Sequence, residues 1–199
     1  MRASSPSQPV TLSDRALPWY ALYTRHQHER AIATMLSSKG FEIFLPLHSA
    51  VHHWKDRRKA VLLPIFPCYV FLRLQGGGDR RFQVVSTPGV YSFVGAGGHP
   101  ATIPQPEIDA IRRTVETRLG IEPHPFLKSG DWVRVTSGPL EGIEGMLVRQ
   151  KSLCRLVLSV ELLQKSVAVE VGAETVERIT VRRPAVDAGS SHGRFAAWA

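Results

Sequence analysis

The chain has 199 residues, of which 43% are hydrophobic, enough for one medium domain or two small ones. No apolar run reaches the roughly 18 residues that cross a bilayer, and the Ser/Pro-rich start lacks a signal peptide's apolar segment, so we expect a cytoplasmic protein without a membrane partner. The net charge of +8 is uneven, since residues 18–120 carry thirteen Lys and Arg against seven Asp and Glu, and residues 121–180 carry seven against eight. A basic module favours nucleic-acid phosphate and a near-neutral one favours protein, although a solvated basic surface remains the alternative.

The predicted elements begin after a Ser/Pro-rich tail. Residues 1–17 and 181–199 are expected to be disordered. Residues 19–23 read as a strand, and residues 27–39 as a helix with Ile32 and Leu36 at helical spacing, ended by Gly40. A second strand is predicted over residues 41–47 and a basic loop over 52–59. Residues 61–64 and 68–74 are predicted to pair as strands around that loop.

The next segment predicts two more helices. One covers residues 79–85, a strand over 90–94 follows the Pro88-Gly89 turn, and Pro104 and Pro106 open the other. This last helix carries an apolar stripe made of Ile108, Ile111, Val115 and Leu119. The order predicts an α+β domain over residues 18–120, an antiparallel sheet with flanking helices. Residues 121–127, with Pro123 and Pro125, predict a stiff linker.

Beyond residue 128 the apolar residues alternate with a period of two. Residues 132–135, 146–148, 156–160 and 167–171 predict four short strands, which is typical of a small all-β barrel over residues 128–180. Gly138, Gly142 and Gly145 are expected to supply positive φ in the turn between the first two strands. Cys68 and Cys154 lie in apolar runs far apart, which predicts buried thiols and no disulfide.

Several motifs together carry a family resemblance. Residues 130–135 (GDWVRV) and 138–145 (GPLEGIEG) resemble a KOW motif. The pair Trp19-Tyr20, the loop ending at residues 57–59 (RRK), the segment 64–71 (PIFPCYVF) and residues 87–90 (TPGV) occur in the order and spacing of the NusG N-terminal domain. Over residues 18–180 the chain resembles NusG-family transcription elongation factors. The segment 64–71 is more similar to specialised paralogues such as RfaH.

The resemblance implies a monomeric factor, without a cofactor, that binds RNA polymerase through its N-terminal domain and suppresses pausing or termination at specific operons. The positions that match the family's polymerase contacts are Tyr23, Phe66, Tyr69, Phe93, Arg80 and Arg81. Aromatic side chains suit such contacts because each buries a large area and has few rotatable bonds. The alternative for the four aromatic residues is that they fill the domain core.

Basic and aromatic residues beside these positions imply contact with the non-template DNA strand or nascent nucleic acid. The candidates are Arg25, His26, His28, Arg30, Lys55, Arg57, Arg58 and Lys59. A solvated helix start and a flexible loop are the competing interpretations.

For the barrel, the resemblance implies Rho or a ribosomal protein as partner, through Leu162 and Leu163. Adjacent side chains of a regular strand face opposite sides, so one of the two should be exposed unless a bulge buries both. A barrel that switches to a helical fold, as in RfaH, is disfavoured by the β-branched Val167, Val169 and Val171.

An enzyme is not expected, and neither is a metal site. The spacings of the histidines and Cys68 match no recurrent ligand pattern, and residues 76–78 (GGG) lack the Lys and Ser/Thr of a phosphate loop. The alternative function is an RNA-binding or ribosome-associated KOW protein that does not act on polymerase. Such a protein would need charge where polymerase docking needs the apolar Phe66 and Tyr69.

Overall fold

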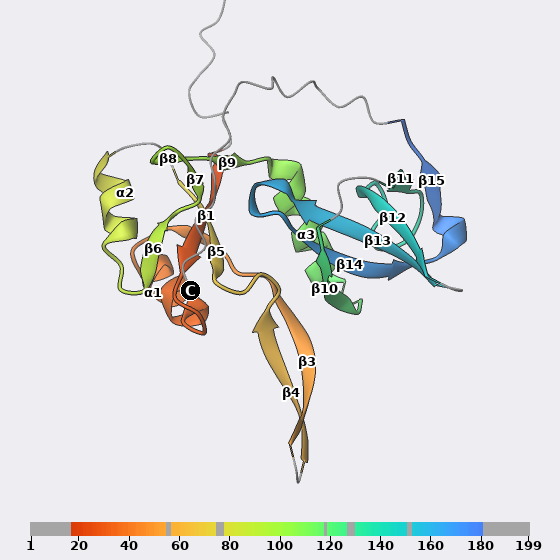
Figure 1. Ribbon diagram of the computed structural model, residues 1–199, viewed down its shortest axis with the longest axis horizontal. Helices are drawn as coiled ribbons and strands as arrows, with labels where there is room; N and C mark the ends of the chain where they lie inside the picture. Colours follow the sequence, from red (N-terminus) through yellow and green to blue (C-terminus); the bar gives the residue numbers. More distant parts are fainter. Residues whose placement is uncertain are drawn as a thin grey trace, which may run out of the picture.

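The computed structural model describes residues 17–54, 57–74, 78–117, 119–126, 130–150 and 153–180. Two antiparallel sheets form its body, helix α3 (Gln105–Glu116) lies between them, and a long hairpin projects from the first sheet (Figure 1). The predicted α+β fold with a second all-β barrel is confirmed. The predicted disordered tails, residue 17 apart, lie outside the described residues. No helix within the described ranges is long and apolar enough to cross a membrane.

The first sheet is built around one buried strand. Its order is β2 (Glu42–Phe44), β5 (Tyr69–Arg73), β1 (Trp19–Thr24) and β6 (Val90–Phe93), and β9 (Thr102–Ile103) also pairs with β1. β1 is central because it pairs with β5, β6 and β9, and its first four side chains are all buried. Alternation sends Trp19 and Ala21 to one face and Tyr20 and Leu22 to the other, so both faces must be covered.

Helices cover the two faces of this sheet. Ile32 and Leu36 of α1 (Glu29–Ser38) and Val84 of α2 (Gly78–Val85) join the apolar cluster of Tyr20 and Leu22. Ile108 and Ile111 of α3 join the cluster of Trp19 on the opposite face. The three predicted helices are therefore confirmed, with ends shifted by a few residues.

The basic segment forms a hairpin and not a loop. β3 (Leu47–Trp54) pairs with β4 (Arg57–Pro64) from Leu47↔Pro64 to Trp54↔Arg57. The predicted pairing of residues 61–64 with 68–74 is wrong, since β5 pairs with β1 and β2. A two-stranded ribbon needs no buried face, so its sequence shows no clear apolar alternation. Two short strands, β7 (Gly95–Ala96) and β8 (His99–Pro100), form a second, smaller hairpin.

The second sheet contains the four predicted barrel strands and two more. Its order is β10 (Ile121–Pro125), β14 (Lys165–Val171), β13 (Leu153–Val160), β12 (Glu144–Gln150), β11 (Asp131–Val135) and β15 (Val176–Arg178). Short 3-10 turns, η2 (Glu161–Leu163) and η3 (Ala173–Thr175), flank β14. The residues predicted as a linker thus form β10, which pairs with β14 along its length. Prolines are tolerated there because β10 is an edge strand.

The glycine-rich turn between β11 and β12 uses its glycines in two ways. Gly138 and Gly142 have φ of +90° and +81°, as predicted. The prediction is wrong for Gly145, which does not have positive φ; a Cβ there would lie 2.7 Å from the carbonyl oxygen of Val157. Gly145 is therefore required for the close approach of β12 and β13 and not for a turn.

Replacing Gly145 with Ala should destabilise the barrel. The added methyl group must push backbone apart, and overpacking of this kind costs about 1–3 kcal/mol of unfolding free energy. Gly120→Ala is the matched control, because a Cβ at Gly120 meets nothing within 4 Å. Urea unfolding of the two variants measures the difference. Equal stabilities would show that β12 and β13 separate without cost.

Candidate functional site

Three tyrosines form a row across the first sheet, which we call the tyrosine surface: Tyr23 of β1, Tyr69 of β5 and Tyr91 of β6. Tyr23 lies opposite Tyr69 in the strand register, with ring centroids 5.8 Å apart, and its ring is 5.4 Å from that of Tyr91. Tyr23 is 44% exposed and Tyr91 60%, while Tyr69 is half-buried. Such a patch of large exposed rings is unusual on a protein surface that has no partner.

The other two predicted aromatic contacts lie elsewhere. Phe66 is 1% exposed and packs edge-on against Phe71, with ring centroids 5.7 Å apart. Phe93 is half-buried against Tyr20 on the face covered by α1 and α2. In this arrangement Phe66 fills the core, the alternative that the sequence left open. Tyr91 was missed, because the pairing of β6 with β1 that brings it beside Tyr23 is a tertiary contact.

The predicted nucleic-acid residues at the start of α1 lie together and are exposed. Arg25, His26, His28 and Arg30 all reach solvent, and the guanidinium Nη2 of Arg30 donates to the carbonyl of Leu62 in β4 at 2.7 Å. This bond ties the helix start to the long hairpin. The backbone of residues 57–59 belongs to strand β4 of that hairpin, but their side chains are outside the described part of the structure. Lys55 as a whole also lies outside the described residues.

Arg80 and Arg81 lie on α2, and Arg80 makes a contact within the domain. The guanidinium of Arg80 lies 5.2 Å from the ring centroid of Phe41. Arg81 is half-buried, and its Nε has no hydrogen-bond partner among the described residues. The predicted contact of Arg80 and Arg81 with polymerase stays a prediction.

The turn that leads into β5 brings three potential ligands together. The Sγ atom of Cys68 is 3.6 Å from Nδ1 of His26, and the Cys68 N–H donates to Oε1 of Glu29 at 2.8 Å. Burial raises the pKa of the Cys68 thiol and the Glu29 carboxylate raises it further, while Lys165 of the barrel opposes the rise. The thiol is therefore protonated at neutral pH when nothing is bound to it.

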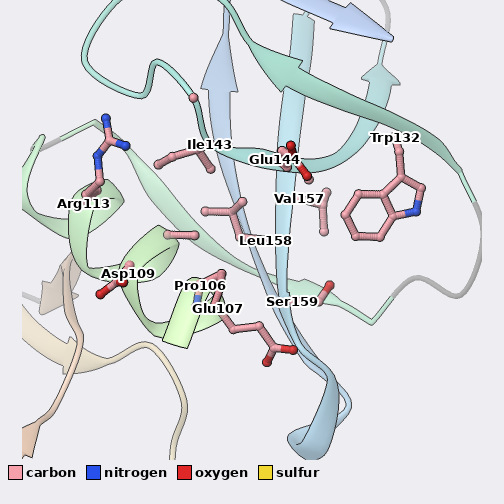
Figure 2. Close-up of a pocket in the computed structure, with 13 residues that line it drawn as sticks. Pro106, Glu107, Asp109, Arg113, Trp132, Ile143, Glu144, Val157, Leu158 and Ser159 are labelled. Atoms are coloured by element: carbon pink, nitrogen blue, oxygen red, sulfur yellow. The ribbon is translucent and has the colours of Figure 1, made fainter. Parts of the chain in front are cut away.

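The boundary between the two domains is closed by α3. Arg113 donates from Nη2 to the carbonyl of Glu141 at 2.9 Å, and the Glu161 N–H donates to Oε2 of Glu107 at 3.3 Å. A groove of about 560 Å³ remains between α3 and the barrel. Glu107 and Arg113 line it on the helix side, and Trp132, Val157 and other barrel residues line it on the opposite side (Figure 2).

The predicted partner segment of the barrel lies at this boundary. Leu162 and Leu163 are on η2, where Leu163 is 8% exposed and Leu162 is half-buried against the shared core. Leu162 is therefore the more accessible of the two but is only partly exposed, because a 3-10 turn does not alternate as a strand does. A smaller hollow lies between the two domains, lined by Phe66 and Pro67 on one side and by Lys165 of the barrel on the other.

Comparison with known proteins gives consistent results. The family profile described as "Transcription termination factor nusG" matches residues 17–112. The transcription termination/antitermination protein NusG of Thermus thermophilus is 31% identical over 149 residues, covering 65% of this chain and 80% of that protein. The chain belongs to the NusG family.

Other members of the family are more distant but match over more of the chain. The NusG of Campylobacter jejuni is 26% identical over 172 residues, covering 81% of this chain and 97% of that protein. A solved structure of Thermotoga maritima NusG superposes with a TM-score of 0.51 at 22% identity, covering 82% of this chain and 97% of that one. The latter supports the NusG fold of both domains.

One carboxyl at the domain boundary titrates near neutrality. Burial raises the pKa of Glu107 to about 7; the hydrogen bond from the Glu161 N–H opposes the rise, and the Glu161 carboxylate adds to it. Glu161 belongs to the barrel, so part of this environment exists only while the barrel is docked on α3. If the barrel leaves, the pKa falls toward the ordinary 4.5.

The closed arrangement should therefore weaken as the pH rises. The closed form has the barrel docked on α3, and the open form has it undocked. Between pH 4.5 and about 7 the closed form binds more protons than the open form. Protonation of Glu107 therefore stabilises the closed form fully at the acidic end of this range, and the stabilisation is lost toward neutrality. Energy transfer between dyes on α2 and β15, followed from about pH 5 to about pH 8, measures the change. Glu107→Gln should flatten the profile, and Asp109→Asn, two residues away, should not. A flat wild-type profile would exclude Glu107 from the control of closure.

Proposed function

We propose that this NusG-family protein is a cytoplasmic, non-enzymatic transcription factor that binds RNA polymerase through the tyrosine surface and changes pausing or termination. The observation that carries the proposal is the row of Tyr23, Tyr69 and Tyr91, with Tyr23 and Tyr91 exposed, inside the segment that matches the family profile. The relatives' names, transcription termination/antitermination protein, support the same role. The likeness of residues 64–71 to RfaH-type paralogues favours action at specific operons.

The tyrosine surface has the chemistry of a protein-binding hot spot. Each ring offers a large apolar area with few rotors to freeze, and each hydroxyl can bond a partner's polar group at the rim. The rings also pack against one another across neighbouring strands, so their side chains are already ordered and lose less conformational entropy on binding. An apolar helical tip of the polymerase is the partner that such a shallow, rigid surface fits.

The start of α1 is proposed to hold single-stranded nucleic acid, with the non-template strand as first candidate. Arg25, His26 and His28 are exposed there and lie next in sequence to Thr24, the last residue of β1. Guanidinium groups attract phosphates, and imidazole rings can stack on unpaired bases. The tyrosine surface and the basic helix start would then act on the same transcription complex.

The barrel is proposed to recruit a second protein, Rho or a ribosomal protein, through η2. Because Leu163 is buried against the shared core, this contact requires the barrel to leave α3 first. The affinity for that partner is then reduced by the free energy of opening.

Replacing Tyr91 with Asp should abolish the effect on transcription. A carboxylate at the end of the tyrosine row, beside Tyr23, would be desolvated by the apolar contact without a partner, so we expect at least a tenfold loss of polymerase affinity, about 1.4 kcal/mol or more. Single-round transcription by purified RNA polymerase on a template with pause sites and a terminator is the assay. Leu119→Asp, at another exposed apolar residue, is the control and should behave as wild type.

The same assay tests the proposed function as a whole. Altered pausing or readthrough that Tyr91→Asp removes supports it. If the wild-type protein neither binds polymerase nor changes transcription, even with native leader DNA upstream, the proposal fails. Retained affinity for RNA would then favour the alternative of an RNA-binding KOW protein.

Replacing Arg25 with Gln should weaken single-stranded DNA binding in a salt-dependent way. Loss of one phosphate contact should make the slope of log affinity against log salt about 0.7 less negative. Fluorescence anisotropy at several salt concentrations measures the slope. Arg178→Gln, which removes the same charge from the barrel, should leave it unchanged. A slope unaffected by Arg25→Gln would mean that this side chain does not contact the strand.

A further inference from the structure

Three side chains from two separate segments converge beside the tyrosine surface. His26 and Glu29 come from the start of α1, and Cys68 from the turn before β5, next to Tyr69. One imidazole nitrogen, one carboxylate oxygen and one sulfur all lie within 4.8 Å of one another. This is a mixed N, O and S donor set of the kind that binds zinc-type divalent ions.

The separation of two donors agrees with a tetrahedral metal centre. Zinc bonds of about 2.3 Å to sulfur and about 2.05 Å to nitrogen, at a tetrahedral angle, place the two ligand atoms about 3.6 Å apart. The observed distance between Sγ of Cys68 and Nδ1 of His26 is 3.6 Å. The pair would need little movement to bind an ion.

The carboxylate of Glu29 is buried, although no cation accompanies it in the described structure. Glu29 is 3% exposed, and none of the ion pairs among the described residues includes it. Its Oε1 accepts the Cys68 N–H, and no other hydrogen bond to this carboxylate comes from the described residues, although a carboxylate has about four acceptor positions. Buried glutamates are rare without a cation or metal partner.

The backbone at Cys68 supports a role for its side chain. Cys68 has φ of +69°, a left-handed conformation that glycine or asparagine adopts at lower cost. The turn is held by the bond from the Tyr69 N–H to the Phe66 carbonyl and by the bond from the Thr24 N–H to the Cys68 carbonyl. A cysteine at a position that suits glycine is explained if its sulfur binds something.

We propose that His26, Glu29 and Cys68 form a binding site for a zinc-type divalent transition-metal ion. Binding replaces the thiol proton, which passes to solvent, so one S–H bond breaks, one metal–sulfur bond forms and no redox change occurs. His26 is exposed, so water can fill the fourth position. The ion would fasten the start of α1 to the turn that carries Tyr69, and so stiffen one edge of the tyrosine surface.

Cobalt titration of the full-length reduced protein tests the site. Co²⁺ reports thiolate coordination directly, because a cobalt–sulfur bond adds a charge-transfer band in the near ultraviolet. We expect one equivalent to bind with that band and Zn²⁺ to displace it. Cys68→Gly should abolish the band and lower the affinity on the order of 100-fold or more, since even outer-shell partners account for about 10–100-fold.

The variants are chosen so that misfolding cannot imitate the result. Glycine suits the left-handed backbone at residue 68, so Cys68→Gly should fold at least as well as wild type. His26→Ala should also weaken binding, whereas His99→Ala and Cys154→Ala, outside the cluster, should leave the spectrum unchanged. Zn²⁺ should raise the unfolding temperature of wild type and not of Cys68→Gly.

Two outcomes would overturn the proposal. One is wild-type protein that binds no Co²⁺, which would leave a simple hydrogen bond between Cys68 and His26. The other is binding without the sulfur band, or binding unchanged in Cys68→Gly, which would place the ion elsewhere. Neither outcome depends on polymerase binding, so the metal site and the proposed function can fail separately.

Discussion

The burial of α3 between two sheets is the interaction on which the arrangement of the whole molecule depends. Ile108 and Ile111 belong to one apolar cluster that also contains Trp19 of the first sheet and Leu156 of the second. If the helix left either sheet, part of a core would be exposed to water. That exposure costs roughly 25 cal/mol of free energy for each Å² of apolar surface. α3 is nevertheless a single element of twelve residues, and a groove lined by both domains runs beside it, so the boundary is less complete than either core.

This shared core decides which surfaces are open. Phe66 and Leu163, one from each domain, are both enclosed in it, and Tyr69 packs against it, whereas Tyr23 and Tyr91 of the tyrosine surface remain exposed. Apolar burial favours the closed boundary, and the buried carboxyl of Glu107 opposes it once ionised. In this arrangement Tyr23 and Tyr91 are exposed, whereas access to Leu163 depends on the balance between these two terms.

Periodicity in the sequence was enough for most of the fold. The helix stripes, such as Ile108 and Ile111, and the alternating strands of the barrel were predictable because one face of each is buried. The β3–β4 hairpin was not, since a two-stranded ribbon needs no buried face and so no such pattern, and β10 was hidden by its prolines. The site depended on tertiary contacts: Tyr91 reaches Tyr23 through strand pairing, and Cys68 reaches His26 across 42 residues of chain.

The pairing of β10 with β14 also bears on how the barrel can be isolated. A fragment cut at the end of the apparent linker, near residue 128, would lack β10 and leave the backbone of residues 165–169 without its partner strand. Unpaired strand edges recruit other chains, so such a fragment would be prone to self-association, or would accept a foreign strand in place of its own. The segment that looks like a tether is thus a protective edge of the barrel, and a faithful barrel fragment begins at or before Ile121.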